Sequence, residues 1–248
     1  MISSSAEQLI SLLDLTRLET EAGDESGTEK ICRKAITGFG PVAAVCVYPA
    51  YIRQARQRVH QEGIAVATVL NFPSGDFPLE QVLQGAESAH SAGASEFDVV
   101  IPYNAWKRGD RQPLLNLVSS LQEYRRRGVV LKAILETGAL TSTERREIGY
   151  ALVDLGVDFL KTSTGKFPVG ATEEAVIDLL SVLANYPAKE RRTGLKISGG
   201  VRSFRQAVRY LDLVEKILGS EFLQAHSLRL GASSLLDDIL SHEKTPCQ

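Results

Sequence analysis

The stretch V-D-F-L-K-T-S-T-G-K, at residues 157–166, begins like a buried β-strand and then places Lys161 where the apolar run should continue. A second lysine, Lys166, follows five positions later, behind Thr-Ser-Thr-Gly. The apolar and aromatic start favours a strand, and the glycine-bearing end favours a turn. A lysine at the inner end of a strand suits either phosphate binding or carbonyl chemistry, and other parts of the sequence must decide between them.

The same pattern of a short apolar run recurs along the chain and predicts further strands. Between the runs lie segments with an apolar period near 3.6, which predicts helices at residues 50–60, 78–90 and 203–218. The predicted strands are at residues 12–18 (L-L-D-L-T-R-L), 41–49, 64–73, 96–102 (E-F-D-V-V-I-P), 129–137 (V-V-L-K-A-I-L-E-T), 157–163, 194–200 (G-L-K-I-S-G-G) and 227–233 (S-L-R-L-G-A-S).

Helix start and stop signals agree with this alternation. Thr141 with Glu144, and Ser203 with Gln206, have the spacing of capping boxes. Glycines stand where helices should end, at positions 63, 93, 128, 156 and 219.

Eight strand-then-helix units in 248 residues predict an α/β protein, a (β/α)8 TIM barrel. We expect a single barrel domain over residues 1–248, with a short additional N-terminal helix. An open doubly wound sheet is the alternative, but no unit carries a G-x-G-x-x-G turn after its first strand, which favours the barrel. In either architecture ligands bind at the carboxyl ends of the strands.

The composition favours a small-molecule partner. The chain is 44% hydrophobic and 23% charged, and its formal net charge is −2. It therefore has no excess of positive charge to attract nucleic acid. Trp106 is the single tryptophan, and a 6% aromatic share gives no stacking platform for single strands. No stretch predicts a signal peptide or a membrane span. The three cysteines do not have the spacing of a disulfide framework and are interpreted as reduced thiols, which predicts a cytoplasmic protein. They are Cys32, Cys46 and Cys247.

Charged residues interrupt four of the predicted strands, namely Asp98, Lys132, Lys161 and Lys196. Burying an unpaired charge is expensive. Each side chain could reach solvent or form a structural ion pair, but convergence on one pocket explains all four together. We therefore expect a polar pocket inside the barrel.

Several lysines in one pocket predict Schiff-base chemistry. A lysine amine with a pKa near ~10.4 is a poor nucleophile at neutral pH. A neighbouring ammonium group and partial desolvation lower that pKa and free the amine to attack a carbonyl. Lys161 with Lys196 is the predicted pair. Asp98 is predicted to move protons, with Lys196 holding it in place.

The turn after Lys161 does not match a nucleotide P-loop, which requires G-x-x-x-x-G-K-[ST]. The turn's glycine has a leucine five positions before it, and Lys166 is followed by Phe167. The turn still suits a single phosphate, through backbone N–H groups and the Lys166 charge. Similar turns at residues 199–202 (G-G-V-R) and 231–234 (G-A-S-S) follow the last two strands, where barrels often bind phosphate. Ordinary turn geometry is the alternative for each one alone, but three in succession favour a phosphorylated substrate.

Other chemistries fit the residue types less well. A zinc site would need several histidines in ligand positions. Cys46 lies in an apolar strand, where a cysteine is more often a small buried hydrophobe than a nucleophile. The four histidines are scattered over predicted helices and a loop, at His60, His90, His226 and His242.

These motifs together resemble the deoxyribose-phosphate aldolases. The resemblance runs in order over nearly the whole chain, and K-T-S-T-G-K in this context is its most specific motif. Its motifs are L-D-L-T-R-L, V-C-V-Y-P, N-F-P-S-G, F-D-V-V-I-P-Y, L-K-A-I-L-E-T-G, D-F-L-K-T-S-T-G-K, L-K-I-S-G-G-V-R and R-L-G-A-S-S-L-L. The resemblance implies a metal-free and cofactor-free class I aldolase on a (β/α)8 barrel. Such an enzyme reversibly cleaves 2-deoxyribose 5-phosphate to glyceraldehyde 3-phosphate and acetaldehyde, in deoxyribose phosphate catabolism.

The resemblance also implies roles for individual residues. Lys161 becomes the Schiff-base lysine, Lys196 the second active-site lysine and Asp98 the proton-transfer group. Lys132 becomes a neighbour that tunes charge. The remaining assignments are substrate contacts at Asp14, Thr16, Cys46 and Thr164, and phosphate contacts at Gly165, Lys166, Gly199, Gly200, Ser233 and Ser234.

The sequence departs from the family pattern in two places. Members with K-P-A-G-G differ from this chain, where Ile197 and Ser198 precede the two glycines. Both glycines are kept, so we expect the phosphate turn to be intact, and the departure bears on substrate preference near it. A tyrosine-bearing tail of some members has no counterpart in K-T-P-C-Q at residues 244–248, which predicts lower turnover.

Two rival functions stay open from the sequence. One is another Schiff-base lyase or a transaldolase-like enzyme for a different sugar phosphate. The other is a barrel that binds a sugar phosphate without turning it over. A homo-oligomer, dimer or tetramer, is compatible with the sequence, which does not fix the oligomeric state.

Overall fold

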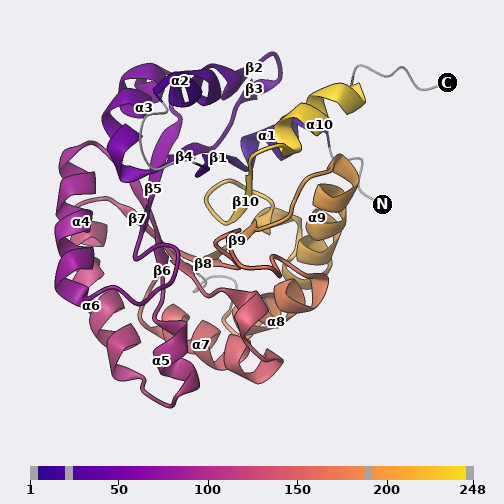
Figure 1. Cartoon of the computed structure of the whole chain (residues 1–248). Coiled ribbons are helices and arrows are strands. Elements are labelled where there is room, and N and C mark those ends of the chain that lie inside the picture. The colour runs from indigo at the N-terminus through magenta and orange to yellow at the C-terminus, as the bar shows by residue number, and fades with distance from the viewer. Residues whose placement is uncertain (1–4, 20–24, 188–191, 244–248) are drawn as a thin grey trace.

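The structure is a computed structural model that describes residues 5–19, 25–187 and 192–243. Eight parallel strands close into a barrel in the order β1-β10-β9-β8-β7-β6-β5-β4, with β1 also paired to β4 (Figure 1). They are β1 (Leu13–Arg17), β4 (Ala44–Val47), β5 (Ala65–Leu70), β6 (Glu96–Val100), β7 (Val130–Ile134), β8 (Phe159–Lys161), β9 (Gly194–Ser198) and β10 (Leu228–Ala232). The predicted (β/α)8 barrel is confirmed, and the open sheet is wrong.

Helices surround the barrel, as Figure 1 shows in a view along its axis. The surrounding helices are α2 (Glu25–Lys34), α3 (Ile52–Val59), α4 (Leu79–Ser91), α5 (Tyr103–Lys107), α6 (Gln112–Arg126), α7 (Ser142–Asp154), α8 (Glu173–Ala184), α9 (Phe204–Leu218) and α10 (Leu235–Glu243). Short 3-10 turns are η1 (Pro49–Tyr51), η2 (His60–Glu62), η3 (Thr137–Ala139) and η4 (Ser220–Phe222). A small antiparallel hairpin of β2 (Ile36–Thr37) and β3 (Gly40–Pro41) follows α2.

The predicted N-terminal helix is present as α1 (Ala6–Ser11), which packs beside α10 (Figure 1). Ser5 caps it by accepting a hydrogen bond from the backbone N–H of Gln8. None of the described helices is both long enough and apolar enough to pass through a membrane.

The helix signals were mostly correct. Thr141 and Glu144 form the predicted reciprocal capping box at the start of α7. The second predicted box is only half formed: Ser203 accepts from the Gln206 N–H, but the Gln206 side chain accepts from the N–H of Arg202 instead of Ser203. All five predicted stop glycines have positive φ, between 69° and 101°.

The strands are buried on both faces because helices cover the outside and side chains fill the inside. Successive strand residues point to opposite faces. Residues two apart, such as Glu96 and Asp98 on β6, therefore share one face of the sheet. Their face is the barrel interior, where charged groups from five other strands meet them.

Candidate functional site

The four charged residues predicted to converge do meet inside the barrel. Asp98 Oδ2 lies 2.5 Å from Lys161 Nζ and 2.6 Å from Lys196 Nζ, and Asp98 Oδ1 lies 3.3 Å from Lys132 Nζ. The strand register explains this, since Asp98 pairs with Lys132 across β6 and β7, and Lys161 pairs with Lys196 across β8 and β9. All four are buried.

Three further charged side chains join them, from β1, β6 and β10. Asp14 Oδ2 lies 2.5 Å from Lys196 Nζ and 2.7 Å from Lys132 Nζ. Arg229 donates to Asp14 and Glu96, and Lys132 also bonds Glu96. We call this group the ion cluster; its members are Asp14, Glu96, Asp98, Lys132, Lys161, Lys196 and Arg229. Neither Glu96 nor Arg229 was selected from the sequence, although Arg229 interrupts an apolar predicted strand and Glu96 begins one.

Electrostatics single out Lys161 within the ion cluster. Burial lowers the pKa of Lys161, and the nearby Lys196 ammonium lowers it further, while Asp98 only partly offsets these effects. Burial also opposes the charge on Lys132 and Lys196. For these two lysines, however, the surrounding carboxylates outweigh burial and raise the pKa above its ordinary value. Lys161 is therefore the lysine most readily deprotonated.

The two aspartates of the cluster stay ionised. Burial alone would raise the pKa of Asp98, but the ammonium groups of Lys132, Lys161 and Lys196 outweigh burial and hold it well below its usual range. The pKa of Asp14 is lowered in the same way by Lys132, Lys196 and Arg229. Asp98 Oδ1 has Lys132 Nζ as an ion-pair neighbour at 3.3 Å but accepts no hydrogen bond among the described residues, so it keeps acceptor capacity.

Cys46 lies beside the cluster on β4 and is fully buried. Burial, with the Asp98 carboxylate, raises the pKa of its thiol to about 11. The thiolate is the reactive form of cysteine. Cys46 is therefore a neutral small side chain at neutral pH, in line with the interpretation as a buried hydrophobe.

A polar pocket of about 170 Å³ opens above Lys161 at the carboxyl ends of β8, β9 and β10. Lys161 is the member of the ion cluster that lines it; Asp14, Asp98, Lys132 and Lys196, like Cys46, lie outside its lining. Thr16 and Thr164 do line it, as do five of the six predicted phosphate residues; Ser234 does not. The full lining is Thr16, Leu18, Glu19, Lys161, Thr164, Gly165, Lys166, Ser198, Gly199, Gly200, Val201, Arg202, Gly231, Ala232 and Ser233.

Glycines shape the floor of this pocket. Gly199 and Gly200 have φ of 92° and 83°, which side chains rarely tolerate. A Cβ on Gly231 would lie 2.8 Å from Ser198 Cβ and 3.0 Å from Lys196 Cε. Gly231 therefore leaves the space through which the Lys196 side chain passes.

Glu136 supports the turn after Lys161, a role that no motif in the sequence indicates. It is 1% exposed and has φ of 56°, a left-handed conformation uncommon for glutamate. The Thr164 hydroxyl donates to its carboxylate and accepts from the Lys166 N–H, at 3.0 Å. Burial raises the pKa of Glu136, and the hydrogen bonds from Thr164 partly offset that rise.

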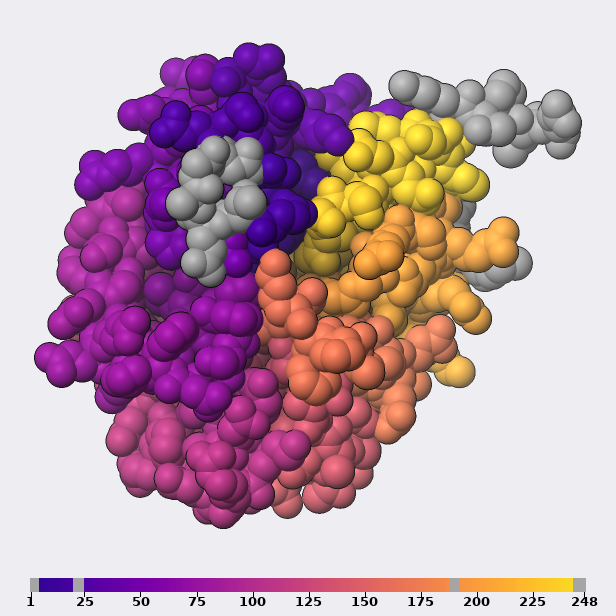
Figure 2. All heavy atoms as spheres, in the orientation of Figure 1, coloured from indigo at the N-terminus to yellow at the C-terminus, as the bar shows by residue number. Residues whose placement is uncertain are grey.

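Lys166 connects this turn to the N-terminal part of the chain. Its Nζ donates to the Leu18 carbonyl oxygen at 2.6 Å. Figure 2 shows the segment just after Lys166, in orange, adjoining the indigo N-terminal region near the middle of the barrel face. The ammonium of Lys166 thus lies on the rim of the pocket.

Ile197 and Ser198, the two residues that depart from the family's K-P-A-G-G pattern, have different structural roles. Ile197 is a fully buried core residue, whereas Ser198 lines the pocket and donates through Oγ to the Ser163 carbonyl at 2.6 Å. Arg202 also lines the pocket and was not selected from the sequence. The predicted effect of the tail at residues 244–248 and the redox state of Cys247 fall outside the described residues.

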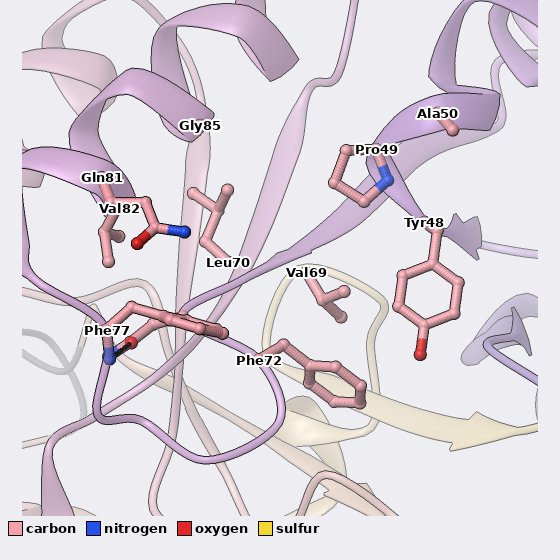
Figure 3. Close-up of a pocket in the computed structure, with 11 residues that line it drawn as sticks. Tyr48, Pro49, Ala50, Val69, Leu70, Phe72, Phe77, Gln81, Val82 and Gly85 are labelled. Atoms are coloured by element: carbon pink, nitrogen blue, oxygen red, sulfur yellow. Dashed lines mark hydrogen bonds between the residues drawn. The ribbon is translucent and has the colours of Figure 1, made fainter. Parts of the chain in front are cut away.

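A second pocket, of about 390 Å³, lies beside β5 and α4 (Figure 3). Tyr48 and Phe72 approach edge to face with ring centroids 6.1 Å apart, and Phe77 faces the same space. Its lining is mostly apolar and contains no charged side chain. Carbonyl chemistry needs an amine and a proton carrier, so the smaller polar pocket is the candidate active site.

No group of three or more histidine, cysteine, aspartate or glutamate side chains within residues 5–19, 25–187 and 192–243 is arranged to hold a metal ion. The three carboxylates of the ion cluster instead surround ammonium and guanidinium groups.

Comparison with known proteins identifies the family. The model of the DeoC/LacD family aldolases matches residues 9–212. Among solved structures, the deoxyribose phosphate aldolase from Aeropyrum pernix, described as a unique tetramer, has 27% identity and a TM-score of 0.79, covering 97% of this chain and 93% of that one. A candidate deoxyribose-phosphate aldolase from Coccidioides immitis has 27% identity and a TM-score of 0.83, covering 98% and 88%. A third, QR15, described as an aldolase, has 26% identity and a TM-score of 0.78, covering 95% and 97%. A barrel of this topology with buried lysines at its carboxyl end agrees with that match, and the chain belongs to the DeoC/LacD family of aldolases.

Proposed function

We propose that the protein is a class I aldolase that reversibly cleaves 2-deoxy-D-ribose 5-phosphate to D-glyceraldehyde 3-phosphate and acetaldehyde. The observation that supports this best is the single carboxylate oxygen of Asp98 shared by Lys161 and Lys196 beneath a glycine-lined pocket. The family match and the 27% identical aldolases support the same reaction.

In the proposed mechanism, the neutral amine of Lys161 attacks the C1 aldehyde and loses water to give an iminium. A base removes the proton of the C3 hydroxyl, the C2–C3 bond breaks, and its electron pair moves to C2 to form an enamine. Glyceraldehyde 3-phosphate leaves, C2 takes a proton, and water hydrolyses the imine to release acetaldehyde. The iminium serves as the electron sink for the cleavage.

Asp98 is the proposed proton carrier for these steps, directly or through water. It lies against the nucleophilic amine and keeps an oxygen, Oδ1, free of hydrogen bonds. Lys196 holds the carboxylate and keeps it ionised. Lys132 does not line the pocket and is proposed to tune the charge of the cluster.

The phosphate is proposed to bind the turns that rim the pocket. Gly165, Gly199 and Gly200 bring backbone close to the space, and Lys166 and Ser233 add polar side chains. Thr16 and Thr164 are proposed to contact the sugar, with Asp14 and Cys46 acting from beneath the pocket. Ser234 remains a proposed phosphate contact, although it does not line the pocket.

We further propose a single barrel domain over residues 1–248, a homo-oligomer and a cytoplasmic location. The tetrameric aldolase from Aeropyrum pernix supports the oligomer, and light scattering on the purified protein tests it. The buried free thiols of Cys32 and Cys46 suit a reducing compartment.

Borohydride reduction in the presence of 2-deoxyribose 5-phosphate, followed by peptide mapping, tests the function. We expect a substrate-derived adduct on Lys161 that is lost in Lys161→Ala and kept in Lys107→Ala, a lysine outside the pocket. Adduct without released aldehyde would indicate a binding protein. An adduct formed only with a different sugar phosphate would indicate a related lyase.

A further inference from the structure

Arg229 and Glu96 have no assigned task, although they occupy the centre of the barrel. Arg229 Nη1 lies 2.6 Å from Asp14 Oδ1, and Arg229 Nη2 lies 3.1 Å from Glu96 Oε1. Lys132 bridges the same two carboxylates from the other side. Neither Arg229 nor Glu96 lines the pocket, so neither touches a substrate there.

The ion cluster contains more cations than carboxylates. Its four cationic side chains, Lys132, Lys161, Lys196 and Arg229, face three carboxylates, Asp14, Glu96 and Asp98. A buried net charge is costly, so the loss of one proton from a lysine balances the cluster. Arginine does not release its proton in proteins.

The distribution of contacts decides which lysine loses the proton. Lys132 contacts three carboxylates and Lys196 contacts two, whereas Lys161 contacts Asp98 alone. Lys161 is also the lysine of the cluster that faces the pocket. We propose that Arg229 and Glu96 are positioning residues that set the charge balance of the cluster, so that Lys161 is the amine that becomes neutral and nucleophilic.

This inference extends the proposed function by assigning control of the nucleophile to a buried pair outside the pocket. Loss of the Arg229 charge leaves three lysines against three carboxylates, so Lys161 keeps its proton to higher pH. Loss of the Glu96 charge increases the cationic excess, so Lys161 gives up its proton at lower pH. The two substitutions therefore act in opposite directions.

The groups that directly surround Lys161 stay unchanged in both variants. They are Asp98, Lys196 and Cys46, with Glu136 at the next strand end. A shift in Lys161 reactivity would then report the distant charge and not a new neighbour.

The test is the rate of Lys161 acetylation by acetic anhydride from pH 5 to 10, measured by peptide mass spectrometry. This readout reports the amine itself and needs no substrate. We expect the pH midpoint of Lys161 acetylation to rise by at least about 0.5 pH unit in Arg229→Met and to fall by a similar amount in Glu96→Gln. These shifts are smaller than the roughly 1–3 pKa units that a charge within about 4–6 Å causes, because the substituted residues lie farther from Lys161 than its direct neighbours. Glu123→Gln removes a carboxylate from an exposed ion pair with Arg126 outside the barrel and should match the wild type.

The double variant Arg229→Met/Glu96→Gln restores the original excess of one cation and should return the midpoint to the wild-type value. Unmoved midpoints, or shifts of the same sign in both single variants, would overturn the inference. If Arg229→Met does not fold, Glu96→Gln against the matched control Glu123→Gln decides the question alone. Wild-type protein that acetylates as described but forms no borohydride adduct would refute the proposed function and leave this inference standing.

Discussion

Lys161 and Lys196 occupy paired positions on neighbouring strands and donate to the same oxygen of Asp98, at 2.5 and 2.6 Å. Two ammonium groups at one acceptor oppose each other's charge. Lys196 is additionally held by Asp14, whereas Lys161 is not. This asymmetry separates the proposed nucleophile, Lys161, from the lysine that is proposed to hold the proton carrier in place.

Asp98→Asn should slow the reaction without preventing folding. An amide keeps the shape of the side chain but cannot carry a proton, and general acid–base catalysis contributes roughly 10²–10⁴-fold. We expect kcat to fall by that factor. The measurement is steady-state release of glyceraldehyde 3-phosphate, with circular dichroism as the folding control. A variant that keeps more than a tenth of wild-type kcat would exclude Asp98 as the proton carrier.

Lys166→Met should weaken recognition of the phosphate specifically. A hydrogen bond to a charged group contributes about 1.5–3 kcal/mol, so kcat/KM for 2-deoxyribose 5-phosphate should fall roughly 10- to 100-fold. The rate with unphosphorylated 2-deoxyribose should change little. Lys107→Met is a matched control, because Lys107 also donates to a backbone carbonyl, that of Ala139, but outside the pocket. Equal losses for both substrates would assign Lys166 a structural role.

Thr164→Val should loosen the turn that Glu136 holds. The substitution removes the hydroxyl that donates to the Glu136 carboxylate and accepts from the Lys166 N–H. An unsatisfied buried group costs about 1–3 kcal/mol, so the free energy of unfolding should fall by that amount and KM should rise. Thr164→Ser keeps the hydroxyl and should behave like the wild type. Urea unfolding measures the stability, and two indistinguishable variants would contradict the role of the hydroxyl.

Glu136→Gln should change how stability depends on pH. The pKa of Glu136 is raised in the folded protein above its ordinary value of 4.5, so the folded state binds more protons between these two values. The stabilising contribution is full below pH 4.5 and is lost as pH rises through the folded pKa. Glutamine removes this loss. Thermal midpoints of Glu136→Gln relative to wild type should therefore increase with pH through this window, and a constant difference would contradict the prediction.

Acid should destabilise the protein through Asp14 and Asp98. The pKa of each is held below its ordinary value of 3.8. Their contribution is therefore present above pH 3.8 and is lost as pH falls below it toward the folded pKa. The unfolding midpoint in urea should fall steeply below about pH 4. Because the pairs are buried, 0.5 M salt should change this dependence little, and a midpoint that is flat from pH 7 to 3 would contradict the expectation.

Much of the barrel could be predicted from the sequence because short apolar runs alternate with segments of helical period, and several of those helices have their own start or stop signals. The convergence of Asp98, Lys132, Lys161 and Lys196 followed from the same runs, since inner faces of barrel strands meet. Glu96 and Arg229 also place a charge in an apolar strand. Their place in the ion cluster, however, depends on which cation pairs with which carboxylate. That pairing is set by the strand register, which no single stretch encodes.

Other features had no local sign at all. The left-handed backbone of Glu136 arises from the bonds made around it, because glutamate does not favour that conformation. Gln206 has the spacing of a capping box with Ser203, yet its side chain accepts from the N–H of Arg202, one residue earlier, and the spacing does not distinguish these two partners. The Tyr48 and Phe72 rings come from separate loops, so their shared pocket depends on tertiary packing.

The bond between Arg229 and Asp14 spans 215 positions of sequence and joins the last strand of the barrel to the first. During synthesis, Asp14 leaves the ribosome long before its partner exists, and the lysines of the middle strands emerge between them. Contacts this distant in sequence form late, since loop closure must precede them. In a nascent chain Lys161 is therefore an ordinary solvated ammonium group, and the proposed nucleophile acquires its lowered pKa only when the last strand closes the barrel.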